Sequence, residues 1–390
     1  MSHAFVGTNT VGGSFGGRGG GIYAAPFDPA TGALGRPALV ADRPDDPTWL
    51  TISRTGRFLL AACHTRSYRG APGGGLVSYA IDDATGSLTE IDDIRLRFPH
   101  VAHVALDRTE RYALCTSSLG GALTAVELAD SGELGGVTRI ETFRGRPAVP
   151  PEGEPQPPFY PGTDIPVIRE GVHTQPHCAM VDAGNEFLVA CDLAQNTVSL
   201  FRFDARSGVP DLVHVVRHPQ PHAGPRLLAP HPDGIHFYSV DEPGVSVTAY
   251  ELDARAARVR ILGSVPLVPR APDVGRRASG IAVHPSGTHL YASVRGHDHI
   301  VHVGLDDPAD PRLRGAVPAG GSSARTIALS PDSRFLYAAN TGSDSVTCFS
   351  LETGTGTPTP VHAPVRVPSP THVVFRTGAT PREVDHHESR

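Results

Sequence analysis

The chain has 390 residues and a formal net charge of −6, and 39% of its residues are hydrophobic while 19% are charged. This balance is typical of a globular protein rather than a disordered one. It predicts no broad basic surface, which argues against nucleic acid as a partner. All 34 basic residues are Arg, so a Schiff-base lysine and a phosphate-loop lysine are excluded.

Cysteine usage and apolar runs bear on the compartment. The cysteines are odd in number, lack a CxxC pair and stand at Cys63, Cys115, Cys178, Cys191 and Cys348. A disulfide framework or a structural zinc site is therefore not expected. The N-terminal segment MSHAFVGTNT has no basic stretch followed by an apolar run, and no run of 18 apolar residues occurs in the chain. Such runs mark leader peptides and membrane helices, so we expect a cytoplasmic protein without a membrane partner.

Two sequence elements alternate along the chain. The first is an alternating strand followed by a turn, as in GIYAAPFDPATGAL from Gly21, and its seven copies begin at 21, 75, 122, 197, 246, 299 and 345. The second is a pair of short strands joined by a turn, and it begins at 48, 102, 177, 226, 279 and 325. A seventh copy, THVVF at 371, has no second strand, while AFVGTN at 4 has no first.

A repeat of about 50 residues with four short strands is the signature of a β-propeller blade. The out-of-phase ends predict that the N- and C-terminal strands close the ring within one blade. We therefore expect an all-β fold: a single seven-bladed propeller of four-stranded antiparallel blades over residues 1–380, with a flexible tail at 381–390.

One interval between copies is longer than the others and contains nine prolines, within residues 144–176. Proline cannot donate to a strand ladder, so this insertion cannot be a central strand. It is either a surface excursion or a lid over one end of the ring, and it leads directly to His177.

Repeat symmetry brings equivalent positions to one height around the channel. The blades align on the turn between the paired strands, at Gly56, Glu110, Asn185, Gly234, Gly287 and Ser333. Gly or Asn at four of these six positions suits a left-handed turn. Eight residues before the turn lie Thr48, Ala102, His177, Arg226, Ser279 and Arg325. Eight residues after it lie His64, Ser118, Leu193, Glu242, Arg295 and Thr341.

These two columns meet at the open end of each hairpin, where charged residues therefore converge. His177, Arg226, Glu242, Arg295 and Arg325 come from consecutive blades, and His103 and His64 are expected to join them. Guanidinium groups clamp carboxylate or phosphate, and a His near a carboxylate is a common general-base arrangement. Glu242 is the expected carboxylate partner of His177. The pattern predicts a site for a small anionic substrate.

Other kinds of site are not favoured. The pairs His173 with His177 and His218 with His222 would share one face only on a helix, and prolines interrupt both runs, so no metal and no cofactor are expected. The glycine-rich segment 12–21 lacks the phosphate-loop motif. The residues do not indicate an oligomeric state.

Several stretches resemble one known family. They include FVGTNT from Phe5, PHCAMVDAGNEFLVACDL from Pro176, GPRLLAPHPDGIHFYSVDE from Gly224 and YASVRGHDHI from Tyr291. By these motifs the chain resembles the seven-bladed propeller lactonases, which include 6-phosphogluconolactonases and the 3-carboxy-cis,cis-muconate lactonizing enzyme. The resemblance implies catalytic roles for His177, Arg226, Glu242 and Arg295.

The expected function is hydrolysis, or formation, of the lactone ring of a small anionic substrate such as a sugar-acid lactone. His177 or Glu242 would activate water, while Arg226 and Arg295 would hold the acidic group and the developing oxyanion. Arg325, His103 and His64 are the expected substrate-binding residues. A 3-carboxymuconate-type cycloisomerase and a non-catalytic binding or scaffold propeller remain as alternatives.

Overall fold

The structure is a computed structural model that describes residues 2–11, 13–14, 16–149, 168–268, 275 and 277–376. The predicted tail at 381–390 and residues 150–167 of the insertion lie outside the described residues. Across the described part, no helix has the length and apolar character needed to cross a membrane.

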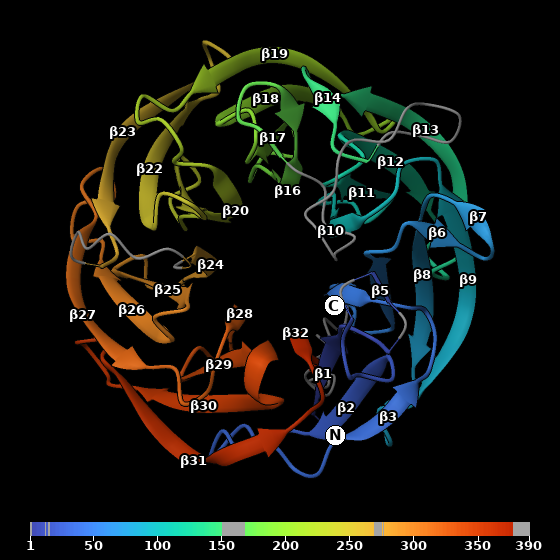
Figure 1. Cartoon of the computed structure of the whole chain (residues 1–390), viewed down its shortest axis with the longest axis vertical. Helices are drawn as coiled ribbons and strands as arrows, with labels where there is room; N and C mark the ends of the chain where they lie inside the picture. The colour runs from blue at the N-terminus through green and yellow to red at the C-terminus, as the bar shows by residue number, and fades with distance from the viewer. Residues whose placement is uncertain are drawn as a thin grey trace, which may run out of the picture.

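Seven four-stranded antiparallel sheets form a ring around a central axis, as Figure 1 shows. Blades 1 to 6 follow the chain from residue 47, and blade 7 combines the two ends of the chain. The innermost strands, in blade order, are β4 (Pro47–Ile52), β10 (Val101–Leu106), β16 (Pro176–Val181), β20 (Pro225–Pro230), β24 (Arg277–Val283), β28 (Ala324–Leu329) and β32 (Pro370–Arg376). The second strands are β5 (Phe58–Cys63), β11 (Tyr112–Ser117), β17 (Phe187–Asp192), β21 (His236–Asp241), β25 (His289–Arg295), β29 (Phe335–Asn340) and β1 (His3–Thr8).

The outer half of each blade has the same order. The third strands are β8 (Gly74–Ile81), β12 (Ala122–Leu128), β18 (Thr197–Asp204), β22 (Ser246–Asp253), β26 (His299–Gly304), β30 (Ser345–Leu351) and β2 (Ile22–Pro26). The outermost strands are β9 (Leu88–Leu96), β13 (Leu134–Thr142), β19 (Val209–Arg217), β23 (Arg258–Pro266), β27 (Arg312–Pro318), β31 (Pro358–Arg366) and β3 (Ala38–Ala41). Small additions are the hairpin of β6 (Ser67–Tyr68) and β7 (Ala71–Pro72), the parallel pair of β14 (Arg146–Pro147) and β15 (His173–Thr174), and the 3-10 turn η1 (Thr341–Ser343).

The burial of each strand explains its apolar or polar composition. The second strands are apolar almost throughout because both of their faces are covered, and β5, β11, β17 and β29 are buried along their whole length. The outermost strands are largely exposed. Apolar clusters lie between blades rather than within one, for example where Phe187 of blade 3, Phe237 of blade 4 and Leu290 of blade 5 share a core.

The predicted closure of the ring is confirmed. Strand β1 pairs antiparallel with β32, with Ala4 opposite Phe375. The last described residue, Arg376, is buried and donates from Nε to the Gly56 carbonyl at 2.8 Å in blade 1. The two ends of the chain are therefore joined to each other and to the next blade.

The predicted left-handed turn is also confirmed. All six aligned turn residues have positive φ, between 57° and 75°, including the non-glycine residues Glu110, Asn185 and Ser333. This conformation lets the short hairpin close so that both of its free ends return to the same side of the ring.

Candidate active site

A cavity of about 590 Å³ lies at one end of the ring, at the open ends of the hairpins. It is lined by His64, Ser118, Leu119, Ile168, Glu170, Gln175, His177, Leu193, Ala194, His222, Arg226, Glu242, Pro243, Arg277, Arg295 and Arg325. We call it the mouth cavity. All five residues that were predicted to converge line the mouth cavity: His177, Arg226, Glu242, Arg295 and Arg325.

The first column of residues reaches the cavity because of a repeated backbone irregularity. Pairing between the innermost and second strands skips one residue at the same place in six blades, at Thr48, Ala102, His177, Arg226, Arg325 and Thr371. In blade 5 the skip covers two residues, Ser279 and Gly280. Such β-bulges re-aim a side chain and release it from the ladder. The column is therefore a ring of bulged residues at the mouth.

The second column is fixed by one hydrogen bond per blade. The residue that follows the second strand donates its amide to a carbonyl just before the innermost strand, as Glu242 does to Gly224 at 2.8 Å and Leu193 to Gln175 at 3.0 Å. The same bond recurs from His64 to Asp46 at 2.9 Å. This contact closes the open end of the hairpin and brings both columns to the same cavity.

Glu242 is surrounded by arginines. Its Oε2 lies 2.8 Å from Arg226 Nε, as an ion pair rather than a directed hydrogen bond, and its Oε1 lies 3.0 Å from Arg295 Nη2. Arg277 Nε is 3.8 Å from Oε1. Burial alone would raise the pKa of Glu242, but the charges of Arg295, Arg226 and Arg277 hold it below its usual value. Glu242 is thus a carboxylate at neutral pH and a weak base.

Arg226 and Arg325 are cations in a poorly solvated place. Burial lowers the pKa of Arg226 to about 10, and its Nη1 donates to the Ser279 carbonyl at 2.9 Å. Burial, together with the charges of Arg226 and Arg295, lowers the pKa of Arg325 to about 9. Within the described residues, the Arg325 side chain has no carboxylate within ion-pair distance. Arg325 is therefore the cation of the cavity that is left to meet an anion.

His177 is a neutral imidazole. Its side chain is buried, and its Nδ1 has no hydrogen-bond partner among the described residues. Burial, and then the charges of Arg226 and Arg325, hold the pKa of His177 well below its ordinary value. Glu242, its expected carboxylate partner, forms ion pairs with Arg226 and Arg295 instead.

His64 lies on the opposite wall. Its Nε2 is 3.0 Å from Ser118 Oγ, and its ring meets that of His100 edge to face, with centroids 5.1 Å apart. Burial, then the neighbouring His100, holds the pKa of His64 well below its ordinary value. The cavity thus carries two neutral imidazoles facing several arginines.

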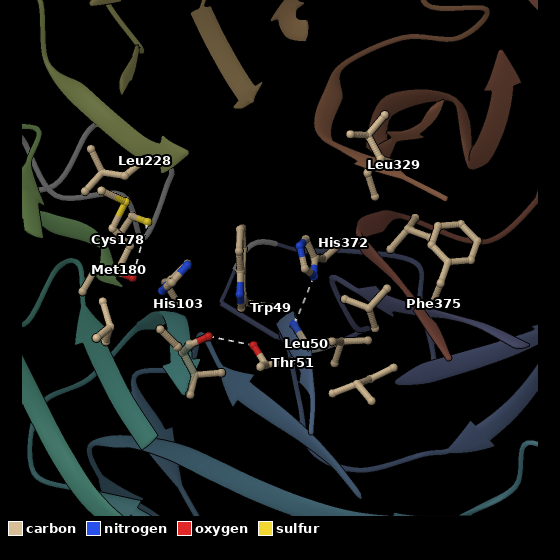
Figure 2. Close-up of a pocket in the computed structure, with 18 of the residues that line it drawn as sticks. Trp49, Leu50, Thr51, His103, Cys178, Met180, Leu228, Leu329, His372 and Phe375 are labelled. Atoms are coloured by element: carbon tan, nitrogen blue, oxygen red, sulfur yellow. Dashed lines mark hydrogen bonds between the residues drawn. The ribbon is translucent and has the colours of Figure 1, made fainter. Parts of the chain in front are cut away.

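His103 lies elsewhere. It lines a second cavity of about 550 Å³, further along the innermost strands, with Trp49, Cys178 and His372 (Figure 2). The Trp49 ring stacks on His372 with centroids 3.9 Å apart and lies 4.3 Å from the His103 ring. All four residues directly follow a bulged residue, so this position forms a second tier of the channel.

Three charged or ionisable residues that line the mouth cavity, Arg277, Glu170 and His222, were not predicted to lie there. Arg277 pairs with Arg295 in the strand ladder and stands two residues before the bulged Ser279. Glu170 Oε2 lies 2.6 Å from His222 Nδ1 and also accepts the His222 amide at 2.9 Å. Loops carry no repeat pattern, so no signal marked Glu170 or His222. Arg277 could have been found from the repeat, because it stands 18 residues before Arg295 just as Gly224 stands 18 residues before Glu242.

The described ends of the proline-rich insertion are attached beside this cavity. Val149 donates its amide to the Leu119 carbonyl at 2.7 Å, and Ile168 packs against the same apolar cluster. Both Leu119 and Ile168 line the cavity. The prediction that 144–176 forms a lid depends on residues 150–167, which lie outside the described residues.

Known proteins resemble the chain over most of its length. A 6-phosphogluconolactonase of Bacillus subtilis is 27% identical over 374 residues, which cover 95% of this chain and 97% of that protein. Among solved structures, a periplasmic gluconolactonase of Pseudomonas aeruginosa has a TM-score of 0.81 at 24% identity and covers 97% of this chain and 99% of that one. A putative 6-phosphogluconolactonase from Bacteroides fragilis has a TM-score of 0.80 at 19% identity, with 96% and 98% covered.

The family described as "Lactonase, 7-bladed beta-propeller" matches residues 3–375, which is nearly the whole propeller. The match spans all seven blades and both columns of the mouth cavity. The chain therefore belongs to the seven-bladed β-propeller lactonase family.

Proposed function

We propose that the protein hydrolyses the lactone ring of a small anionic sugar-acid lactone in the mouth cavity. The observation that carries this proposal is the set of arginines around one carboxylate and a neutral His177. Membership of the lactonase family, and relatives named as 6-phosphogluconolactonase and gluconolactonase, support it. The substrate class proposed is a phosphorylated gluconolactone, whose phosphate supplies the negative charge.

Arg325 and Arg295 are the proposed anchors of the substrate. Arg325 has no carboxylate within reach among the described residues, and Arg295 meets Glu242 with Nη2, 3.0 Å from Oε1. A carboxylate or phosphate on the substrate would complete the charge balance that Glu242 alone does not provide. Planar guanidinium groups bind such groups through paired hydrogen bonds.

His177 is proposed as the general base in preference to Glu242. A carboxylate held by arginines is poorly basic, whereas the lone pair of a neutral imidazole is available. The charges of Arg226 and Arg325 depress the pKa of His177, so an anion bound to those arginines raises it. Binding of the substrate would therefore increase the basicity of the residue that acts on it.

The reaction balances with these residues. His177 takes a proton from water as its oxygen attacks the lactone carbonyl carbon, and an arginine stabilises the oxyanion. The ring C–O bond then breaks, and the former ring oxygen receives the proton from His177. The carboxylic acid so formed releases its own proton to solvent and leaves as the carboxylate. Glu242 holds Arg226 and Arg295 in place throughout and is a positioning residue.

The two histidines predicted to bind substrate, His64 and His103, lie in different cavities. His64 lines the mouth cavity and can contact the substrate there. His103 is not included because it lies in the second cavity of the channel. The cycloisomerase and scaffold alternatives are not favoured, because the named relatives are lactonases.

The test is hydrolysis of 6-phosphogluconolactone and of glucono-δ-lactone, measured as the acid released at constant pH. The parent chain should turn over 6-phosphogluconolactone with a higher kcat/KM than the uncharged glucono-δ-lactone, and His177→Ala should lower kcat by about 10²–10⁴. His214→Ala is the matched control, since His214 lies on the outermost strand β19, where its ring accepts the Val259 amide at 3.2 Å. Binding without turnover by the parent would favour a scaffold, and conversion of a carboxymuconate instead would favour the cycloisomerase.

The cytoplasmic location also remains a proposal. Its support is that all five cysteines are buried and free of disulfides, as expected in a reducing compartment. Cell fractionation with compartment markers tests it.

A further inference from the structure

The far end of blade 4, opposite the mouth, carries a cluster of two histidines and an aspartate. His231 and Asp233 stand in the turn after β20, and His236 is the first residue of β21. One ligand atom from each lies within 4.8 Å of the other two. The strand rise of about 3.3 Å per residue puts His231 about 17 Å along the chain from Arg226. The cluster is therefore separate from the mouth cavity.

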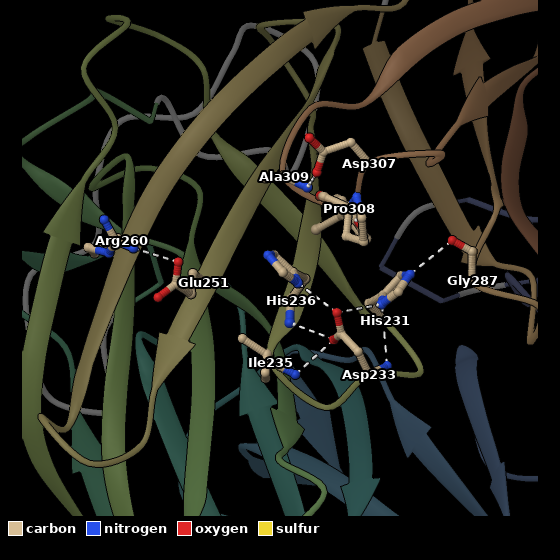
Figure 3. Close-up of polar contacts among 11 residues, drawn as sticks. His231, Asp233, Ile235, His236, Glu251, Arg260, Gly287, Asp307, Pro308 and Ala309 are labelled. Atoms are coloured by element: carbon tan, nitrogen blue, oxygen red, sulfur yellow. Dashed lines mark hydrogen bonds and ion pairs between the residues drawn. The ribbon is translucent and has the colours of Figure 1, made fainter.

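The imidazole of His231 has a fixed orientation, which Figure 3 shows. Its Nε2 lies 2.9 Å from the Gly287 carbonyl of blade 5, so this nitrogen carries the proton. Its Nδ1 therefore presents a lone pair, and it accepts the Asp233 amide at 3.3 Å. A metal-binding histidine usually donates from one nitrogen to a carbonyl and presents the lone pair of the other to the ion. Here an ion would replace the long contact from the Asp233 amide.

The carboxylate of Asp233 is equally well held. Its Oδ1 accepts the amides of Ile235 at 2.8 Å and His236 at 2.9 Å. Its Oδ2 lies 2.6 Å from His236 Nδ1 and 3.0 Å from His231 Nδ1. Two lone pairs, one from His231 and one from the carboxylate, thus face each other at close range. A cation between them would turn this repulsion into attraction.

Blade 5 provides an internal comparison. The equivalent hairpin has His284, Ser286 and His289. His284 Nε2 approaches the Ser333 carbonyl of blade 6 at 3.2 Å, and its Nδ1 lies 2.8 Å from Ser286 Oγ. The contact of a turn histidine with the next blade is therefore a repeated structural feature that needs no carboxylate. Asp233 is what distinguishes blade 4.

We propose that His231, Asp233 and His236 bind one divalent transition-metal ion of the zinc class. Two imidazoles and one carboxylate are a common donor set for zinc, with bonds of about 2.0–2.2 Å and a fourth position for water. Such bonds place ligand atoms about 3.4 Å apart, so the carboxylate oxygen must move away from the two imidazole nitrogens by about 0.4 to 0.8 Å. The side chains of Asp233 and His236 are 30% and 19% exposed, so the ion and its water can enter. His236 would give up its Nδ1 proton on binding.

The experiment is a calorimetric titration of the full chain with Zn²⁺. It uses a His386→Ala/His387→Ala background, which removes the dihistidine of the tail. One zinc ion should bind per chain and should raise the midpoint of thermal unfolding. Asp233→Ser, which copies the turn of blade 5, and His236→Ala should each weaken zinc binding by more than about tenfold. Ser286→Ala is the matched control in blade 5 and should bind zinc like the parent.

Lactone hydrolysis without added zinc should be unchanged in Asp233→Ser, which shows that this variant folds. Two outcomes overturn the proposal: no zinc binding by the parent chain, or the same affinity and stoichiometry in Asp233→Ser as in the parent. Should Asp233→Ser fail to fold, Asp233→Asn keeps an acceptor for both amides and removes the charge, and loss of zinc binding is again required.

Discussion

Glu242 Oε2 lies 2.8 Å from Arg226 Nε, and the two residues stand at the two free ends of one hairpin. The other oxygen of the same carboxylate lies 3.0 Å from Arg295 Nη2 in the next blade. One side chain therefore joins two blades and orients two arginines of the mouth cavity.

Replacing this carboxylate should destabilise the fold. Glu242→Gln leaves Arg226, which is 3% exposed, without its counter-charge, and removal of one partner of a buried ion pair costs about 3 kcal/mol. Urea unfolding at pH 7 measures it. Glu251→Gln, in the exposed Glu251–Arg260 pair of the same blade, is the control and should cost less than about 1 kcal/mol.

The difference in unfolding free energy between the parent and Glu242→Gln should also depend on pH. The pKa of Glu242 is lowered in the folded chain, so its contribution is present above its unfolded pKa and is lost as the pH falls through the folded value. The two unfolding curves should converge in acid. A constant difference down to the lowest pH measured would contradict the role assigned to this charge.

Arg325→Gln should shift the acid limb of the kcat/KM profile toward higher pH. The neutral form of His177 is the proposed base, and the charge of Arg325 helps to hold its pKa well below the ordinary value. Loss of that charge raises the pKa, so protonation of His177 inactivates the enzyme at a higher pH. Arg258→Gln, on the exposed face of β23, should leave the limb in place. An unchanged limb in Arg325→Gln would show that His177 is not the titrating base.

Asp192 should make stability fall as the pH rises toward 6. Burial raises its pKa to about 6 although the amides of Gln175 and Gln195 donate to Oδ1, at 2.8 and 2.9 Å. Between its unfolded and folded pKa values the folded chain binds more protons, so unfolding becomes easier as the pH rises through that interval. Relative to Asp192→Asn, the parent should lose about 2 kcal/mol between pH 4.5 and pH 7. Equal pH slopes in urea unfolding of the two proteins would refute this.

Arg376→Ala should weaken the closure of the ring. The side chain is 3% exposed, bonds the Gly56 carbonyl at 2.8 Å and forms an ion pair with Asp83. Loss of these charged hydrogen bonds should lower the free energy of unfolding by about 2 kcal/mol. The exposed Arg258→Ala serves as the control, and equal stability of the two variants would show that Arg376 does not contribute to closure.

The sequence predicted the propeller because its repeats carry both the strand pattern and the turn. Gly234 and its equivalents set the phase, so Arg226 and Glu242 could be placed at one open end before any coordinates were known. The position of His103 could not be derived in this way, because one residue beyond a bulge the side chain enters a different tier of the channel. Glu170 and His222 escaped prediction because they lie in loops, where no symmetry relates one blade to the next.

The bulge at the start of each innermost strand has a consequence for how such a protein can change. A bulged residue is released from the ladder, so its side chain can change with little effect on strand pairing. Thr48, Ala102 and Thr371 occupy this position in blades 1, 2 and 7 as small side chains, whereas His177, Arg226 and Arg325 occupy it in blades 3, 4 and 6. Of these residues, His177, Arg226 and Arg325 line the mouth cavity, so a substitution at this position of one blade can change the substrate preference while the ladder of that blade stays intact.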